Sequence, residues 1–123
     1  MSFAIQGSRP IWQQITEQLA RRIITGAYPL GSRFPAVREL AAEAGVNPNT
    51  MQRAITQIET LGLVTTNRTL GRTVTENAGA LEEMRRRLAV ECTENFFKEM
   101  GALGYSRGEA ADMAQAEREK NDE

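Results

Sequence analysis

Residues 45 to 54 read GVNPNTMQRA, and this short stretch decides the fold. Asn47 has the short oxygen-bearing side chain that caps free backbone N–H groups at a helix start, a contribution of about 1 kcal/mol. Pro48, at the first helical position, gives up only an N–H that would be unpaired in any case. Val46, before the cap, can pack on Met51 one turn into the helix. The stretch therefore predicts the start of a helix.

The helix that begins here has two chemically different faces. At 100° per residue, apolar side chains gather on one side, while amides, hydroxyls and a guanidinium gather on the other. Gly62 supplies the stop. We expect the first face to join the core and the second to stay outside. The apolar members are Met51, Ala54, Ile55, Ile58 and Leu61, and the polar members are Asn49, Gln52, Arg53 and Thr56.

The neighbouring elements predict a winged helix-turn-helix. An amphipathic pattern runs from Pro10 to Gly26, and a shorter helix opens at Pro35 and ends at Gly45. Two runs rich in threonine and valine follow, at residues 63–66 and 72–75, and the connection between them contains a glycine. Three short helices followed by a hairpin give a mostly α fold with a small β-hairpin.

Past Asn77 the composition changes, and the pattern predicts one long amphipathic helix of about 26 residues, or roughly 39 Å. Its apolar residues recur about every 3.7 positions, which favours a straight helix over a coiled-coil seam. A helix this long cannot fold over so small a domain, so we expect a second copy to cover it about a two-fold axis. The predicted dimer interface consists of Leu81, Met84, Leu88, Cys92, Phe96, Phe97, Met100 and Leu103.

The chain thus divides into a winged domain, residues 1–76, and a helical dimerisation region, residues 77–123. Ser106 and Glu109 form a capping box for a last helix. The tail from residue 117 to 123 is expected to fray. Cys92 is expected to be a buried small hydrophobe, and Trp12 to serve core or domain packing rather than to be a ligand platform. The short C-terminal part leaves little room for a ligand cavity, so a small-molecule effector stays open.

Charge is distributed unevenly. Residues 1–76 carry eight arginines against five acidic residues, a balance of +3, whereas residues 77–123 carry seven basic against eleven acidic residues, a balance of −4. The first part can meet a polyanion, and the second would be repelled by one. A merely solvated surface would account for the same charges.

The composition also excludes several function classes. The chain has no histidine, so the usual acid–base groups and most zinc sites are absent. Its single cysteine rules out an internal disulfide and does not favour an oxidising compartment. No membrane-length apolar run or signal peptide is visible. We expect a cytoplasmic protein that is not an enzyme and needs no cofactor or metal.

The outer face of the third helix has the chemistry of a DNA reader. Asn and Gln pair with adenine, Arg with guanine, and the Thr methyl group with thymine, on a helix of major-groove width. Arginines near the second helix and the hairpin tip suit phosphate or the minor groove. Polar helix faces are also common where they are only solvated. The candidates are Asn49, Thr50, Gln52 and Arg53 for bases, and Arg38, Arg68, Gly71 and Arg72 elsewhere.

The motifs P-x-x-R-x-L-A at 35–41 and G-V-x-x-x-T at 45–50, with a wing glycine at 71, are specific in combination. Through them residues 10–75 resemble the DNA-binding domain of the GntR family of bacterial transcription regulators. The NPNT start and the short C-terminal part are similar to the YtrA subfamily. The resemblance implies DNA contacts by Arg38, Asn47, Pro48, Asn49, Thr50, Gln52 and Gly71.

The same resemblance implies a homodimer on double-stranded DNA. YtrA-like proteins dimerise through a short helical region, and their genes often accompany ABC transporter operons. We therefore expect a repressor on a near-palindromic operator. Pro48 stands where many relatives carry a DNA-contacting Arg, which places more of the readout on Asn49, Gln52 and Arg53. Thr69 and Thr73 replace a glycine and an aromatic residue of the wing, which leaves its contacts open.

A function of another class remains. The same polar face could bind a protein, as in winged-helix interaction modules that do not bind DNA. Salt dependence separates the two, because phosphate contacts impose a steep negative slope of log affinity against log salt.

Overall fold

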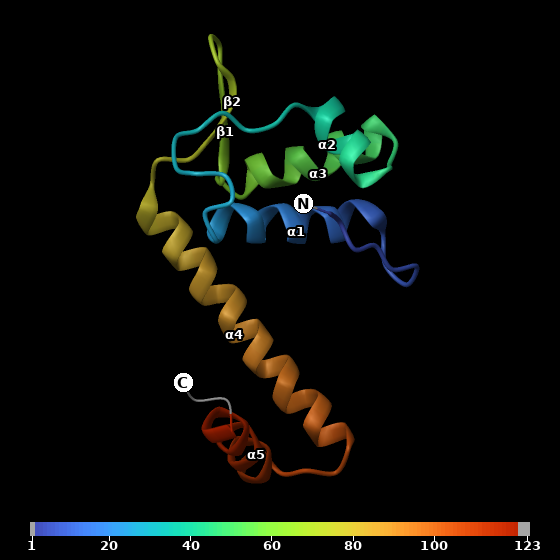
Figure 1. Cartoon of the computed structure of the whole chain (residues 1–123), viewed down its shortest axis with the longest axis vertical. Coiled ribbons are helices and arrows are strands. Elements are labelled where there is room, and N and C mark those ends of the chain that lie inside the picture. Colours follow the sequence, from blue (N-terminus) through green and yellow to red (C-terminus); the bar gives the residue numbers. More distant parts are fainter. Residues whose placement is uncertain (1, 121–123) are drawn as a thin grey trace. The chain divides into compact units, whose positions relative to one another are not determined.

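The computed structural model describes residues 2–120 and confirms the mostly helical fold with one antiparallel hairpin (Figure 1). The chain forms two compact units, one ending at Met84 and the other beginning at Arg85. Among residues 2–120, no helix combines the length and apolar character needed to cross a membrane. In chain order the elements are α1 (Ile11–Ile24), α2 (Val37–Ala44), α3 (Pro48–Thr60), β1 (Val64–Asn67), β2 (Gly71–Val74), α4 (Ala78–Ala102) and α5 (Arg107–Lys120).

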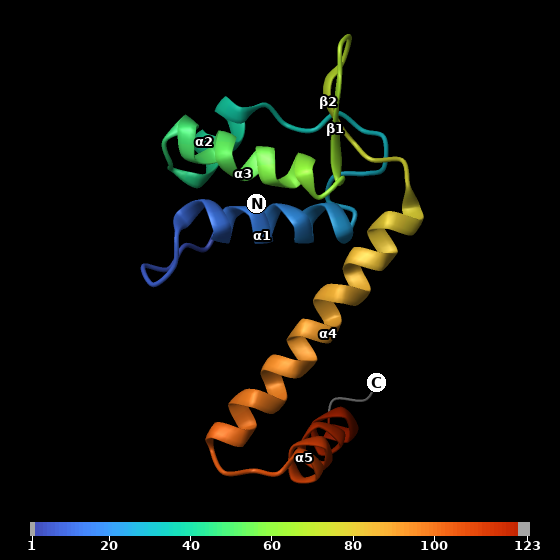
Figure 2. The same ribbon diagram turned by 180° about the vertical axis from the view of Figure 1, so that it is seen from behind.

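The core of the first unit lies where three helices and the base of the hairpin meet. α1 packs along α3, α2 packs near the start of α3, and the hairpin leaves the other end of α3 (Figures 1 and 2). The apolar positions of each helix point to this junction, as their 3.6-residue spacing predicts. The fully buried large side chains are Ile15, Leu19, Ile23, Phe34, Leu40, Met51, Ile55, Ile58, Leu63, Val64 and Val74.

α3 begins as its sequence predicts. The side-chain oxygen of Asn47 accepts a hydrogen bond from the backbone N–H of Asn49 at 2.7 Å, and Pro48 is the first helical residue. Met51 is fully buried. Leu61, however, is 37% exposed, so its assignment to the core face was wrong. The helix ends at Thr60, and the chain turns away before Leu61 reaches the core.

The second helix and the hairpin loop are shorter than expected. α2 begins at Val37 rather than at Pro35, and Ala36 caps it without a side-chain hydrogen bond. The hairpin loop has three residues, not five. The side-chain oxygen of Asn67 closes that loop by accepting hydrogen bonds from two backbone N–H groups, those of residues 69 and 70, at 2.8 and 3.1 Å.

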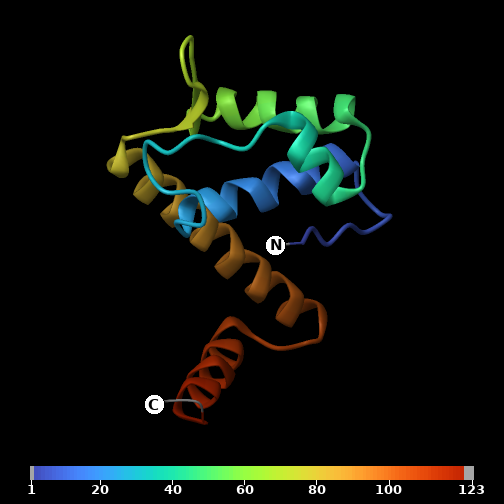
Figure 3. The same ribbon diagram turned by 45° about the horizontal axis from the view of Figure 1, so that its top comes forward.

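A further segment holds the base of the hairpin. The backbone N–H of Phe34 donates to the carbonyl of Arg72 at 2.8 Å, and that of Val74 donates to the carbonyl of Ser32 at 2.8 Å. Arg33 forms a single antiparallel bridge with Thr73. The sequence indicated only turn formers here. The segment between α1 and α2 thus fixes the free edge of β2, where it passes the hairpin base in Figure 3.

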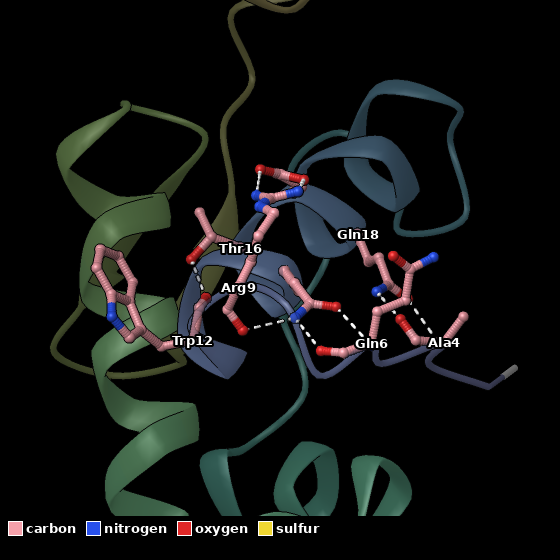
Figure 4. A network of polar contacts seen from close by, with 8 residues as sticks. Ala4, Gln6, Arg9, Trp12, Thr16 and Gln18 are labelled. Carbon is pink, nitrogen blue, oxygen red and sulfur yellow. Dashed lines mark hydrogen bonds and ion pairs between the residues drawn. The ribbon is translucent and has the colours of Figure 1, made fainter.

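An extended N-terminal arm, also missed, lies along α1 (Figure 4). The side-chain amide of Gln18 pairs with both backbone groups of Ala4, at 3.0 and 2.6 Å. Gln14 does the same with Gln6, at 2.8 and 2.6 Å. The two glutamines stand four residues apart on α1, so they meet alternate residues of an extended segment.

The second unit contains most of α4 together with α5. Ser106 and Glu109 form the predicted capping box, with hydrogen bonds of 2.9 and 3.1 Å. The hydrogen bonds from the backbone and the hydroxyl of Ser106 lower the pKa of Glu109. α5 continues to Lys120, so the first four residues of the tail that was expected to fray are helical. The rest of that tail, residues 121–123, lies outside the described residues.

The apolar residues of α4 are at most half-buried within a single chain. None of its residues is buried. Leu81 and Met84, at its start, are half-buried against the core of the first unit. Cys92 is exposed, so the expectation of a buried thiol was wrong for this chain by itself. Leu103, expected in the dimer interface, falls just past the helix end and is 74% exposed.

The second unit has more hollow space than the sequence led us to expect. An open groove of about 540 Å³ lies between α4 and α5. The expectation that this region leaves little room for a cavity was therefore wrong. The lining residues are Cys92, Thr93, Phe96, Phe97, Ala111, Ala114, Gln115 and Arg118.

Candidate nucleic-acid interface

The outer face of α3 presents amides and hydroxyls. Asn49 is exposed, and its side chain has no polar partner among residues 2–120. Gln52 is half-buried and donates to the hydroxyl of Thr56 at 3.2 Å. Thr50 is half-buried at the first turn. α3 runs along the outer side of the first unit (Figure 3), so a groove-sized partner can approach the exposed side of this helix.

Asn47 and Pro48 form the start of this face, and both are exposed. The oxygen of Asn47 is already used as the helix cap. The proline has no N–H to donate. The direct contribution of these two residues is therefore to set the first turn, from which Asn49 projects.

Arg53 makes a contact that the sequence analysis did not predict. Its guanidinium carbon stands 4.2 Å from the centre of the Trp12 ring, a cation–π contact between α3 and α1. Trp12 is accordingly half-buried beside α3 rather than within the core. Residue 53 lies at the edge of the polar arc, so its long side chain reaches the neighbouring helix. Arg53 is itself exposed, and its role in reading bases stays a prediction.

The hairpin tip carries Arg68, which is exposed and whose side chain has no polar partner among residues 2–120. Gly71 has a φ of 79°, a left-handed conformation that favours glycine. Nothing lies within 4 Å of a Cβ built there. The glycine is therefore explained by the backbone turn, and close approach to a ligand is a separate prediction.

Arg72 is tied to a residue that the sequence analysis did not select. Its Nε donates to Oε1 of Glu59 at 3.0 Å, and the hydroxyl of Thr66 donates to Oε2 of the same carboxylate at 2.8 Å. Burial would raise the pKa of Glu59, but these hydrogen bonds and the charge of Arg72 outweigh it and lower that pKa. A signal was available, because Glu59 is the one acidic residue of α3.

Several acidic groups of the first unit are already paired. Glu17 binds Arg9, Glu43 binds Arg22, and Glu59 binds Arg72. By contrast, Arg33, Arg38 and Arg68 are exposed and have no ion-pair partner in the described part of the chain. The unpaired positive charge suits phosphate groups. Arg38 was predicted for this role, whereas Arg33 was missed because its segment read only as a turn.

A metal site finds no support in the described residues. Within residues 2–120 no three His, Cys, Asp or Glu side chains group closely enough to hold a metal ion.

The helix order, the hairpin and the cap of α3 lead to a comparison with known families. The protein-family sequence model described as "Bacterial regulatory proteins, gntR family" matches residues 11–74, about half of the chain. The chain belongs to the GntR family. These are transcriptional regulators with a DNA-binding domain of this winged-helix fold, as the sequence motifs predicted.

The relatives also confirm the YtrA-like resemblance. This GntR protein is 38% identical over 109 residues to the uncharacterized HTH-type transcriptional regulator YhcF of Bacillus subtilis, covering 89% of this chain and 90% of YhcF. It is 37% identical over 73 residues to the HTH-type transcriptional repressor YtrA of the same organism, covering 59% of this chain and 56% of YtrA.

A solved structure extends the likeness to the second unit. A GntR family transcriptional regulator from Listeria monocytogenes has a TM-score of 0.82 and 34% sequence identity to this chain, with 91% of this chain and 98% of that chain covered. The helices after the hairpin therefore belong to the shared architecture.

Proposed function

We propose that this GntR protein is a repressor that binds a near-palindromic operator as a homodimer. The observation that carries the proposal is the outer face of α3, where the capped first turn leaves the amide of Asn49 exposed and without a partner in the described part of the chain. A free amide in this position can pair with both edge groups of adenine. Thr50 and Gln52, on the same face, would contact neighbouring bases.

The surrounding cations would hold the helix in the groove. Arg38, near the start of α2, and Arg68, at the wing tip, are exposed and have no acidic partner among residues 2–120. Such arginines bind phosphate or enter the narrow minor groove. Asn47, Pro48 and Gly71 would act mainly by shaping the helix start and the wing, and Arg72 would contact phosphate from the wing.

The dimer would form through the second unit. Leu88, Phe96, Phe97 and Met100 remain half-buried within a single chain, and Cys92 remains exposed. The α4–α5 groove is open and mostly apolar, which a second copy would cover. Two copies would then present two α3 helices to half-sites about one helical turn, or a multiple of it, apart.

Repression follows if the bound dimer occludes RNA polymerase. The relative YtrA is named a repressor, which supports this direction of control. Control of an ABC transporter operon is the corresponding expectation for the regulated genes. The protein would act in the cytoplasm and would not be an enzyme.

Salt dependence of binding tests the proposal. Fluorescence anisotropy with labelled duplexes, from about 50 to 200 mM salt, should show affinity for duplex DNA that falls steeply as salt rises. A protein that binds no duplex even at the lowest salt would contradict the proposal and favour a protein partner for the α3 face.

A further inference from the structure

One carboxylate joins α3 to both strands of the hairpin. Glu59, in the last turn of α3, accepts from Thr66 of β1 at 2.8 Å and from Arg72 of β2 at 3.0 Å. The side chains of Glu59 and Arg72 are each 27% exposed, so the pair is partly shielded from water. The hairpin thus has a second attachment, separate from its base.

The base of the hairpin does not depend on this carboxylate. Val64 and Val74 are buried there, and the backbone N–H of Thr75 donates to the carbonyl of Leu63 at 2.9 Å. The 31–34 segment pairs with β2 from its other edge. Loss of the Glu59 contacts should therefore leave the hairpin folded but free to change its angle to α3.

Arg72 is held in a way that leaves part of its guanidinium available. Glu59 binds its Nε, and its two terminal nitrogens have no hydrogen-bond partner among residues 2–120. A guanidinium fixed through Nε presents its remaining N–H groups in a defined direction, as phosphate recognition requires. Arg72 can therefore serve the wing attachment and a phosphate at the same time.

We propose that Glu59 is a positioning residue for DNA binding, which fixes the wing relative to the recognition helix and aims Arg72 at a phosphate. The proposal rests on the proposed DNA-binding function. It makes a prediction opposite to that of simple electrostatics. A carboxylate near DNA repels phosphate, so its removal alone should tighten binding.

The first test compares Glu59→Ala with Glu39→Ala. Both substitutions remove one negative charge from a helix of the first unit, and alanine supports both helices. Glu39 is exposed and has no partner among residues 2–120, which makes it the matched control. Anisotropy with the operator duplex should show unchanged or tighter binding for Glu39→Ala. Glu59→Ala should bind about threefold more weakly, as for a partly exposed pair, with a salt slope lower by about one.

A second test separates positioning from a loss of stability. Arg68, at the wing tip, shares no contact with Glu59, yet both would act through the same wing. In the Arg68→Ala background, the substitution Glu59→Ala should therefore cost little further affinity, whereas independent effects would add. Thr66→Val breaks one of the two attachments without changing charge, and it should weaken binding in the same direction.

The outcomes distinguish a failure of the positioning role of Glu59 from a failure of the proposed DNA-binding function. Should wild type bind the operator while Glu59→Ala binds equally well or more tightly, the positioning role is wrong and DNA binding stands. Additive losses in the double variant would likewise overturn it. If wild type itself ignores duplex DNA, the proposed function fails first.

Discussion

The two units of the chain treat their apolar side chains in opposite ways. In the first unit, up to Met84, three helices and a hairpin enclose eleven fully buried large side chains. In the second unit, α4 has no buried residue and α5 only Ala110. The first unit completes its core alone, whereas the second leaves apolar surface that a partner would cover. Each prediction below tests one side of this contrast, beginning with the largest effect.

Disruption of the predicted dimer interface on α4 should separate the proposed dimer. Leu88→Asp combined with Phe96→Asp would place two charges on the surface to be covered, where burial is costly. Light scattering should report a mass near 13.6 kDa in place of twice that value. The control is Val90→Asp, because Val90 is 48% exposed and lies on another side of α4. An unchanged dimer in the double variant would show that Leu88 and Phe96 do not lie in the interface.

Removal of Arg22 should destabilise the first unit. Its side chain, 9% exposed, donates to Tyr28 and Glu43 at 2.6 Å each, and its guanidinium carbon lies 4.0 Å from the ring centre of Phe3. Arg22→Met leaves these groups unpaired, which should lower the free energy of unfolding by about 2 to 3 kcal/mol. Urea denaturation measures it.

The neighbour on the same helix provides the control for that experiment. Arg21 is exposed, so Arg21→Met should change the free energy of unfolding by no more than about 0.5 kcal/mol. Equal losses in the two variants would show that the Arg22 contacts do not hold the arm and the helices together.

Asn49→Ala should reduce sequence preference. The loss should be about 1 to 3 kcal/mol on the preferred operator and smaller on random DNA. Arg53→Ala should cost less specificity, because its guanidinium already lies over the Trp12 ring. Competition binding with specific and random duplexes measures both. Equal losses on the two kinds of DNA would show that Asn49 does not read bases.

The smallest effect concerns pH and the attachment of the wing. The pKa of Glu59 is lowered in the folded protein, so its contribution to stability is present above the pKa of an unfolded glutamate. It is lost as pH falls through the lowered, folded value. The stability difference between wild type and Glu59→Gln should therefore shrink on acidification. Denaturation curves at a series of pH values would measure it, and a difference that grows toward low pH would contradict the assigned sign.

Local signals predicted the elements that local chemistry controls. The Asn47 cap and the capping box at Ser106 formed as expected, because each depends on residues within one turn. The apolar face of α3 was correct except at Leu61, which lies just beyond the helix end. Element boundaries shifted by one or two residues where the competing turn geometry was not visible in sequence.

Contacts between distant residues account for what was missed. The pairing of Gln14 and Gln18 with the N-terminal arm joins residues up to fourteen positions apart. The contacts of Arg72 with Glu59 and of Arg53 with Trp12 likewise cross between elements. The sequence pattern places Arg53 on the outer face of a helix and Arg72 on a strand of the hairpin, but it does not show which neighbour their long side chains meet. The DNA and dimer residues remain predictions until binding is measured.

Selection of bound fragments from random duplex DNA tests the central claim most directly, since the claim is that the outer face of α3 reads bases twice in a dimer. We predict enrichment of a near-palindrome whose half-sites are about one helical turn or a multiple apart, and loss of that enrichment with Asn49→Ala. No enrichment over the starting pool, with wild-type protein at low salt, would contradict it.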